Sequence, residues 1–463
     1  MLRLVGKILT WLIVLVLVVF AAAVAWLYVF PPALIQVAAG YSAKMVCSNV
    51  FVAGRDPVEV LKVDVQAPGH PILGLISEKV DREGGTVLAE LMGVFGGGLA
   101  LARPNAGCTS VPDGDLSQAA LSEVPASAAP APAGLWPQGE DVQPWTDAVF
   151  ASILDDPRMA GPGMRALVVV HDGRIVGERY GEGFTAQTPL LGWSMTKTVT
   201  AAILGTLVHE GRITLDQDAL VEGWTDERSK IRIADLMAMS SALEFNEDYG
   251  DVTDVTRMLY LKPDMAAFAA DKPLVGEVGK VFSYSSGTTV LLSRIWQNAL
   301  GDSAGALAWP RRKLFDPLGM RSAVLELDAR GTYVGSSYLY ATARDWARFG
   351  QFLLQDGRWN GQQILPSGFV AWMREPAPAS QRAYGRGQVW LRGPSAGTPE
   401  GENPDRGFEL PADTFWLLGH DGQSMAVVPS LKLVVLRMGL TPSKLGYKSQ
   451  QMLEAISKVL PKS

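Results

Sequence analysis

The first hydrophobic block of the chain has the pattern of a membrane-spanning helix. The run from Ile8 to Phe30 contains no charged residue, and as a helix it would rise about 34 Å, enough for a bilayer core of about 30 Å. Arg3 and Lys7 precede it, which favours a cytoplasmic N-terminus and an extracytoplasmic remainder. We expect residues 1–32 to be a single-pass anchor in the cell (inner) membrane; a cleaved signal peptide is the alternative.

The next two segments differ in composition. Residues 41–112 read as a small β-rich extracytoplasmic unit, because Leu61–Val65 alternates between apolar and polar residues. The glycine-rich Phe95–Gly98 segment indicates a loop or bulge. Residues 113–142 are expected to be a linker, since 125–134 contain only Pro, Ala, Ser and Gly.

Residues 143–463 show strand patterns at both ends and helical patterns between them. Ala166–His171 and Arg174–Tyr180, joined by an Asp-Gly pair, predict a hairpin. Further patterns predict three antiparallel strands and a closing helix, at Thr414–Leu418, Ser424–Val428, Leu433–Met438 and Ser449–Leu460. The fold class is therefore α+β: one antiparallel sheet built from both ends, flanked by helices, with a helical subdomain from about 190 to 380.

The composition narrows the possible functions. The chain has 463 residues, with 41 Lys+Arg against 47 Asp+Glu, and this balance makes a nucleic-acid partner unexpected. Four histidines and two cysteines cannot form a His/Cys zinc cluster, so no metal is expected. Cys47 and Cys108 both follow the anchor, in a compartment that permits oxidation. They form either a disulfide or two unrelated buried thiols.

Candidate chemistry begins at Ser194. The residues that follow it form an amphipathic pattern to about His209, so Ser194 lies at the start of a helix with Lys197 one turn further on the same face. A serine hydroxyl becomes a nucleophile when a base takes its proton. Lys197 can be that base if burial or a neighbouring cation lowers its pKa.

Two further motifs follow in order, Tyr284-x-Ser286 and His420-x-Gly422. With Ser194-x-x-Lys197 they resemble the three motifs of the serine β-lactamase and penicillin-binding protein superfamily. Within it, residues 145–460 are most similar to the class C-type branch, in particular to 6-aminohexanoate-dimer hydrolases and related esterases. Other segments that look like those hydrolases are Leu236–Leu243, Phe245–Tyr249, Thr342–Gly350 and Gly419–Ser424.

This resemblance implies a β-lactamase/transpeptidase-like fold and a role for each motif. Ser194 would be the acylated nucleophile, Lys197 and Tyr284 the proton-transfer pair, and the N–H groups of Ser194 and Gln423 the oxyanion hole. No cofactor is implied. The residues expected to border the substrate are His420, Gly422, Ser286, Trp193, Asp248 and Tyr249. A structural histidine, a packing tryptophan and solvated loop residues are the alternatives for His420, Trp193 and the Asp248–Tyr249 pair.

Three features qualify this picture. Ser286 stands where the superfamily usually has asparagine, and a hydroxyl offers fewer hydrogen bonds than an amide. His420 and Asp421 replace the lysine and hydroxyl residue of Lys-Thr-Gly, which predicts poor penicillin hydrolysis. Ser303 lies in a G-x-S-x-G pattern, but a helical pattern precedes it, so Asp302 or Ser303 is expected to be a helix cap.

The function predicted from the sequence is that of a membrane-anchored, extracytoplasmic serine hydrolase that cleaves an amide or ester bond of a small molecule through an acyl-enzyme. One alternative is a non-catalytic envelope binding module with the same fold. Another is a D-amino-acid-specific peptidase, which a requirement for a free substrate carboxylate would favour.

Overall fold

A computed structural model describes residues 2–120, 123–127 and 132–461. Its largest sheet has five antiparallel strands in the order β12-β13-β14-β5-β6. Val435 of β14 lies opposite Val169 of β5, so the sheet joins the two ends of the predicted 143–463 region. The hairpin and the three C-terminal strands are confirmed. The bounds are β5 (Met164–His171), β6 (Arg174–Tyr180), β12 (Phe415–Gly419), β13 (Gln423–Val428) and β14 (Leu433–Gly439).

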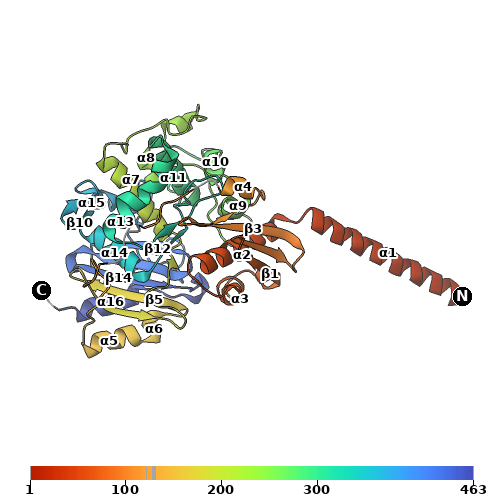
Figure 1. Cartoon of the computed structure of the whole chain (residues 1–463), viewed down its shortest axis with the longest axis horizontal. Coiled ribbons are helices and arrows are strands. Elements are labelled where there is room, and N and C mark those ends of the chain that lie inside the picture. The colour runs from red at the N-terminus through yellow and green to blue at the C-terminus, as the bar shows by residue number, and fades with distance from the viewer. Residues whose placement is uncertain (1, 121–122, 128–131, 462–463) are drawn as a thin grey trace.

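Helices cover both faces of this sheet. Val168 and Val170 of β5 belong to the hydrophobic cluster that also contains α14 (Ala343–Leu354). Leu167 and Val169 belong to a second cluster with α5 (Ala148–Asp155) and α16 (Gln450–Val459). This alternation follows from the two-residue period of a strand. Figure 1 shows the resulting layers, with α14 on one side of the strands and α5 and α16 on the other.

A largely helical region lies between β6 and β12. Asp302 caps one of its helices by accepting the N–H groups of Ala304 and Gly305, so Ser303 lies at a helix start, as expected. Its helices are α7 (Met195–His209), α8 (Ile233–Met237), α9 (Asp254–Leu261), α10 (Met265–Ala270), α11 (Ser286–Ala299), α12 (Ser303–Pro310), α13 (Asp316–Leu318), α14 and α15 (Phe369–Met373). Its short strands are β7 (Leu190–Leu191), β8 (Val324–Leu325), β9 (Leu339–Ala341), β10 (Arg358–Trp359) and β11 (Gln362–Gln363).

The helix α1 (Leu2–Val29) extends away from the rest of the molecule (Figure 1). The most apolar 18-residue window of the stretch Arg3–Val29 has a mean hydropathy of 3.0, and none of it is buried. By length and composition it can cross a membrane, and a signal sequence would have the same properties.

A second helix and a four-stranded antiparallel sheet follow α1. Helix α2 (Ala33–Phe51) lies directly on β3, where a Cβ on Gly98 would be 2.3 Å from the carbonyl carbon of Ala39. The glycine-rich run therefore belongs to a strand, and its pairing with β2 shifts register as in a bulge. The strands are β1 (Ile76–Asp81), β2 (Thr86–Leu91), β3 (Phe95–Arg103) and β4 (Gly107–Ser110).

The strand expected at Leu61–Val65 is wrong, because these residues lie in a π-helical segment, Val60–Gln66. Leu61, Asp64 and Val65 are buried, which is a helical spacing. Asp64 is held there by two cations, Arg55 and Arg165. The short helices of this part of the chain are α3 (Pro57–Glu59), α4 (Leu116–Ala119) and α6 (Pro157–Ala160).

The part of the chain from α2 to β4, called here the N-terminal unit, is fastened to the rest of the protein at Glu326. The Glu326 carboxylate is fully buried and accepts hydrogen bonds from Lys44 Nζ (2.5 Å), Ser48 Oγ (2.8 Å) and the Cys108 N–H (2.6 Å). Cys47 and Cys108 form a disulfide, with a Cα–Cα distance of 6.0 Å. Because a lone buried charge is very costly, Lys44 and Glu326 each require the other.

The predicted linker is packed where the structure describes its C-terminal part. Trp136 is buried, and its indole N–H donates to the carbonyl of Arg344 at 3.3 Å. Arg348 donates to the carbonyls of Pro137 and Gly139. Trp136 thus fixes this segment to α14. Residues 121–122 and 128–131 of the predicted linker lie outside the described residues.

Candidate active site

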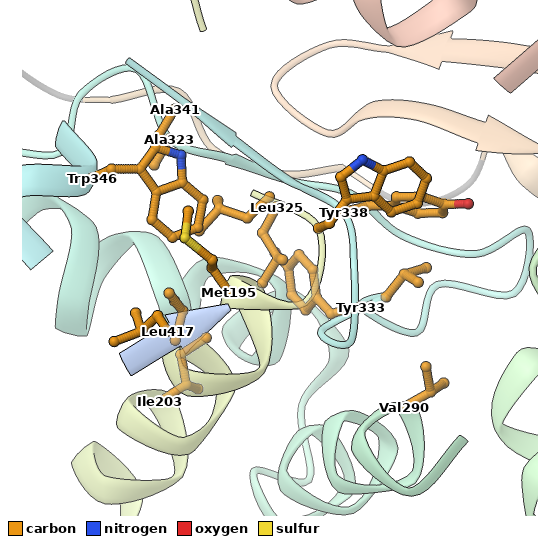
Figure 2. Close-up of a cluster of buried hydrophobic side chains, with 14 of the residues drawn as sticks. Met195, Ile203, Val290, Ala323, Leu325, Tyr333, Tyr338, Ala341, Trp346 and Leu417 are labelled. Carbon is orange, nitrogen blue, oxygen red and sulfur yellow. The ribbon is translucent and has the colours of Figure 1, made fainter. Parts of the chain in front are cut away.

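Helix α7 positions both the candidate nucleophile and the candidate base. Ser194 is the N-cap residue, and Lys197 one turn later donates from Nζ to Ser194 Oγ at 2.9 Å. The helix is fixed against the large sheet through its apolar face, where Met195 and Ile203 lie near Leu417 of β12 (Figure 2). A rigid helix therefore presents both side chains in fixed positions.

Burial prepares Lys197 to accept a proton. Its side chain is only 1% exposed, and desolvation lowers the pKa of the ammonium from its usual 10.5 to about 8. The carboxylate of Glu247 opposes this shift from 3.9 Å, because a nearby anion stabilises the ammonium. A lysine with a pKa of about 8 is partly neutral in mildly alkaline solution, as a general base must be.

Glu247 is a residue of the site that the sequence analysis did not identify. Ser286 Oγ donates to one oxygen of Glu247 at 2.5 Å, and the Ser286 N–H donates to the other at 2.7 Å. Lys197 Nζ donates to Ser286 Oγ at 3.0 Å and to the Ser336 carbonyl at 3.1 Å. The hydroxyl of Ser286 therefore bridges lysine and glutamate, at the position where the superfamily usually has an amide.

The Glu247 carboxyl is itself affected by its surroundings. Desolvation raises its pKa above the usual range, while the Lys197 charge and the Ser286 hydrogen bonds act in the opposite direction. Glu247 and Tyr249 line the same cavity, whereas Asp248 between them is exposed and accepts the N–H of Gly250 at 2.8 Å. Asp248 was expected to border the substrate, but its side chain faces solvent. Alternate residues of this extended segment face opposite sides, so Glu247 and Tyr249 face the cavity and Asp248 faces away from it.

Tyr284 lies over the lysine, with Lys197 Nζ 4.7 Å from the centre of its ring. Desolvation, together with the charge of Glu247, raises the pKa of the Tyr284 phenol well above 10, and a hydrogen bond with Ser194 lowers it only in part. The structure therefore favours a neutral Tyr284 phenol beside Lys197. Burial and the negative charge of Glu247 both oppose the alternative arrangement, in which a Tyr284 phenolate is paired with a Lys197 cation.

The turn between β12 and β13 forms the opposite wall. Gly419 allows this turn to approach the start of α7, since a Cβ there would be 2.3 Å from the carbonyl oxygen of Gly192. Gln423 fixes the turn to β14, because its side chain accepts the Gly439 N–H at 2.8 Å and donates to the Gly439 carbonyl at 2.5 Å. Gly422 and Gln423 line the same cavity as Ser194.

Three aromatic rings lie close together beside Ser194. The His420 ring lies 4.8 Å from Tyr249 and 5.4 Å from Trp193, and Trp193 lies 6.2 Å from Tyr249, measured between ring centres. Trp193 has a positive φ of 47°, an uncommon conformation for a residue other than glycine. Such strained backbone is typical of functional sites, and here it directly precedes Ser194.

The cavity in front of Ser194 has a volume of about 780 Å³. Tyr284, Trp390 and Arg392 line it together with the residues described above. Among the described residues, no group of three His, Cys, Asp or Glu side chains could hold a metal ion. The chemistry that these side chains themselves can perform is transfer of an acyl group to a hydroxyl.

An antiparallel sheet from both chain ends, with a lysine-paired serine at the start of a helix beside it, is the arrangement of β-lactamase-fold hydrolases. Residues 154–441 match the model of the Beta-lactamase family, and the chain belongs to this family.

The chain is related to 6-aminohexanoate-dimer hydrolase. It is 25% identical to that enzyme of Paenarthrobacter ureafaciens over 246 residues, which are 48% of this chain and 60% of the relative. The solved structure "Putative 6-aminohexanoate-dimer hydrolase from Bacillus anthracis" is 26% identical, with a TM-score of 0.54 over 67% of this chain and 83% of that chain. A penicillin-binding protein homologue from Caulobacter crescentus shares the fold at 15% identity, with a TM-score of 0.51 over 69% of this chain and 99% of that chain.

Proposed function

We propose that this protein is a serine hydrolase that cleaves an ester or amide bond of a small molecule through an acyl-enzyme on Ser194. The observation that carries the proposal is the 2.9 Å hydrogen bond from Lys197 Nζ to Ser194 Oγ, made by a buried lysine whose pKa is lowered to about 8. Burial also lowers the pKa of the structural Lys44, so the lowered pKa supports the assignment only together with the contact to Ser194, whose side chain lines an open cavity as a nucleophile must.

In the first step, neutral Lys197 takes the proton of Ser194 as Oγ attacks the substrate carbonyl. The N–H groups of Ser194 and Gln423 are assigned to the oxyanion, because both residues line the cavity and the start of α7 favours negative charge. When the bond breaks, the leaving group takes a proton from the Tyr284 hydroxyl, and Lys197 returns its proton to Tyr284.

In the second step, water attacks the acyl-serine. Lys197, neutral again, accepts a proton from the water, and Ser194 Oγ leaves with a proton supplied through the same pair. The net reaction adds one water across the ester or amide bond, and it uses no group beyond the side chains named. His420 and Tyr249 form the wall against which the substrate is oriented.

We also propose that α1 anchors the protein in the cell membrane with its catalytic part outside the cytoplasm. The apolar stretch Arg3–Val29 supports an anchor, and the disulfide between Cys47 and Cys108 fits an oxidising compartment. Fusion of a reporter that is active only after export to the C-terminus tests the orientation. An inactive reporter on a stably produced fusion would contradict it.

The nucleophile is tested by fluorophosphonate labelling of the full chain in detergent, followed by intact-mass analysis. We use the full chain because the N-terminal unit packs through Glu326 on residues 143–463, which we call the hydrolase part. Wild type should gain one adduct, and Ser194→Ala should gain none and lose at least about 10⁴-fold in kcat on a chromogenic ester. Ser303→Ala, which changes the serine of the G-x-S-x-G pattern, is the matched control and should behave as wild type. Absence of an adduct and of turnover in folded wild type would instead favour a non-catalytic binding module.

A further inference from the structure

A second cavity lies beside the active site, between the N-terminal unit and the hydrolase part. Its volume is about 140 Å³. One side is apolar and is formed by Leu34, Val37 and Ala38 of α2 and by Ile72 and Leu73 from the segment that follows Gly69. We call this the α2 cavity. Its apolar side comes from a part of the chain outside the region that matches the Beta-lactamase family.

The α2 cavity adjoins the Ser194 cavity. Tyr249, His420 and Asp421 line both of them, and Trp193, the residue before the nucleophile, lines the α2 cavity. The two cavities therefore share a wall, and one end of a substrate whose carbonyl lies at Ser194 would have to pass the Tyr249 and His420 rings to reach α2. The rings would contact that end through their faces and edges, which suits an apolar group.

The charges around the α2 cavity exclude one class of ligand. Asp251 and Asp421 line it, and a ligand with a carboxylate at this end would meet two like charges. Apolar groups meet no such penalty and gain from leaving water. An apolar cavity of about 150 Å³ can hold a molecule the size of benzene, so the α2 cavity has room for about six carbon atoms.

The position of the α2 cavity relative to α1 indicates where such a group would come from. Leu34 follows the last residue of α1, Val29, by a stretch of chain that spans at most about 18 Å. The same unit exposes apolar side chains, with Leu75 50%, Met92 64% and Val94 49% exposed. Figure 1 shows α1 leaving the molecule at the end formed by α2, β1 and β3. With α1 in a bilayer, this end of the protein faces the membrane surface.

We propose that the α2 cavity binds the apolar acyl chain of the substrate while its carbonyl is attacked by Ser194. This inference rests on the proposed function and specifies the substrate class: esters or amides of uncharged acyl chains with about six or more carbon atoms. The acyl chain in the α2 cavity is part of the acyl group that stays on Ser194 after the bond breaks. The leaving group occupies the Ser194 cavity.

The test measures kcat/KM for p-nitrophenyl esters from acetate to dodecanoate, with the full chain in phospholipid nanodiscs. For wild type we expect kcat/KM to rise about fourfold for each added methylene up to about hexanoate. Ala38→Leu fills the cavity and should lower kcat/KM for hexanoate at least about tenfold, with acetate unchanged. Leu34→Ala enlarges the cavity and should move the optimum to longer chains. Ala267→Leu, the same change at an exposed alanine of α10, is the matched control and should leave the profile as in wild type.

The outcomes separate the inference from the function on which it rests. If fluorophosphonate labels Ser194 and the chain-length profile is the same in wild type, Ala38→Leu and Leu34→Ala, the α2 cavity does not bind the acyl chain and the hydrolase function stands. If Ser194 is neither labelled nor active in folded protein, both fail. Should Ala38→Leu not fold, the opposite shift expected of Leu34→Ala decides the question. A diacylglycerol analogue placed in the nanodisc distinguishes the source: its cleavage assigns a membrane lipid, and cleavage of the soluble esters alone assigns a soluble substrate.

Discussion

Replacing Glu247 by glutamine should shift the pH dependence of hydrolysis toward acid. Glu247 lies 3.9 Å from Lys197 Nζ, and its negative charge raises the lysine pKa. At that distance two unit charges interact by about 4 kcal/mol for an effective dielectric constant of about 20. The hydrogen bonds from Ser286 to Glu247 reduce this effect, and opposite charges at such distances commonly shift a pKa by about 1–3 units.

The sign of the shift follows from which form of Lys197 is active. Only the neutral amine can take the proton of Ser194, so kcat/KM of wild type should rise with pH through the lysine pKa of about 8. Without the carboxylate, the ammonium is less stable and the same rise should occur at about pH 5–7. For a shift of two units, the ratio of kcat/KM at pH 6 to that at pH 9 should increase from about 0.01 to about 0.5.

The assay is a pH profile of kcat/KM from pH 5 to 10 on one chromogenic ester. Asp248→Asn is the matched control. It removes a neighbouring carboxylate that is exposed and that accepts the N–H of Gly250 in its own turn. It should leave the profile unchanged. If the rise stays near pH 8 in Glu247→Gln, then Glu247 does not stabilise the Lys197 ammonium and the assignment of Lys197 as the base titrating near pH 8 is refuted.

Four more predictions concern the architecture. Lys44→Met leaves Glu326 as an unpaired buried charge and should lower the free energy of unfolding in urea by about 3–5 kcal/mol; an unchanged midpoint would contradict the buried ion pair. Cys47→Ser opens a loop with a sequence separation of 61 and should lower the free energy of unfolding by about 4 kcal/mol, measured by thermal unfolding without reductant. Equal stability would show that the disulfide is not formed in the purified protein. Gly98→Ala places a Cβ 2.3 Å from the Ala39 carbonyl carbon and should cost about 1–3 kcal/mol in the same experiment, while Gly223→Ala, with open space around it, should cost less than about 1 kcal/mol. Gly419→Ala should displace the His420 turn from α7 and lower kcat/KM up to about 100-fold, and wild-type activity in this variant would show that the close approach to Gly192 is not needed.

Local patterns predicted the parts of the fold whose structure depends on local contacts. The Asp172-Gly173 pair sets the β5–β6 turn, so the hairpin could be located from the sequence. The same holds for α7, which begins at Met195 after the Ser194 cap and ends at His209. The β-lactamase-like fold and the convergence of Ser194 and Lys197 on one helix face could also be predicted.

The remaining features depend on contacts between distant parts of the chain. Asp64 is buried because Arg165 reaches it from β5, and no pattern within 60–66 contains that information. Glu247 contacts Ser286 through a fold that brings two loops together, although its alternation with Tyr249 was a signal that both face the same side. The raised pKa of Tyr284 likewise depends on burial and on the charge of Glu247, which the motifs alone do not include.

The contact of Lys44 with Glu326 constrains how the protein matures. The two residues are 282 positions apart. Helix α2 therefore leaves the ribosome long before Glu326, which pairs with the Lys44 charge, has been made. Cys108 is made much earlier, and the disulfide can therefore close while the hydrolase part is still incomplete. Until Glu326 arrives, Lys44 must stay in water and the apolar face of α2 lacks its final partner. The first segment to be synthesised after α1 can therefore complete its native contacts only after residue 326 has been made.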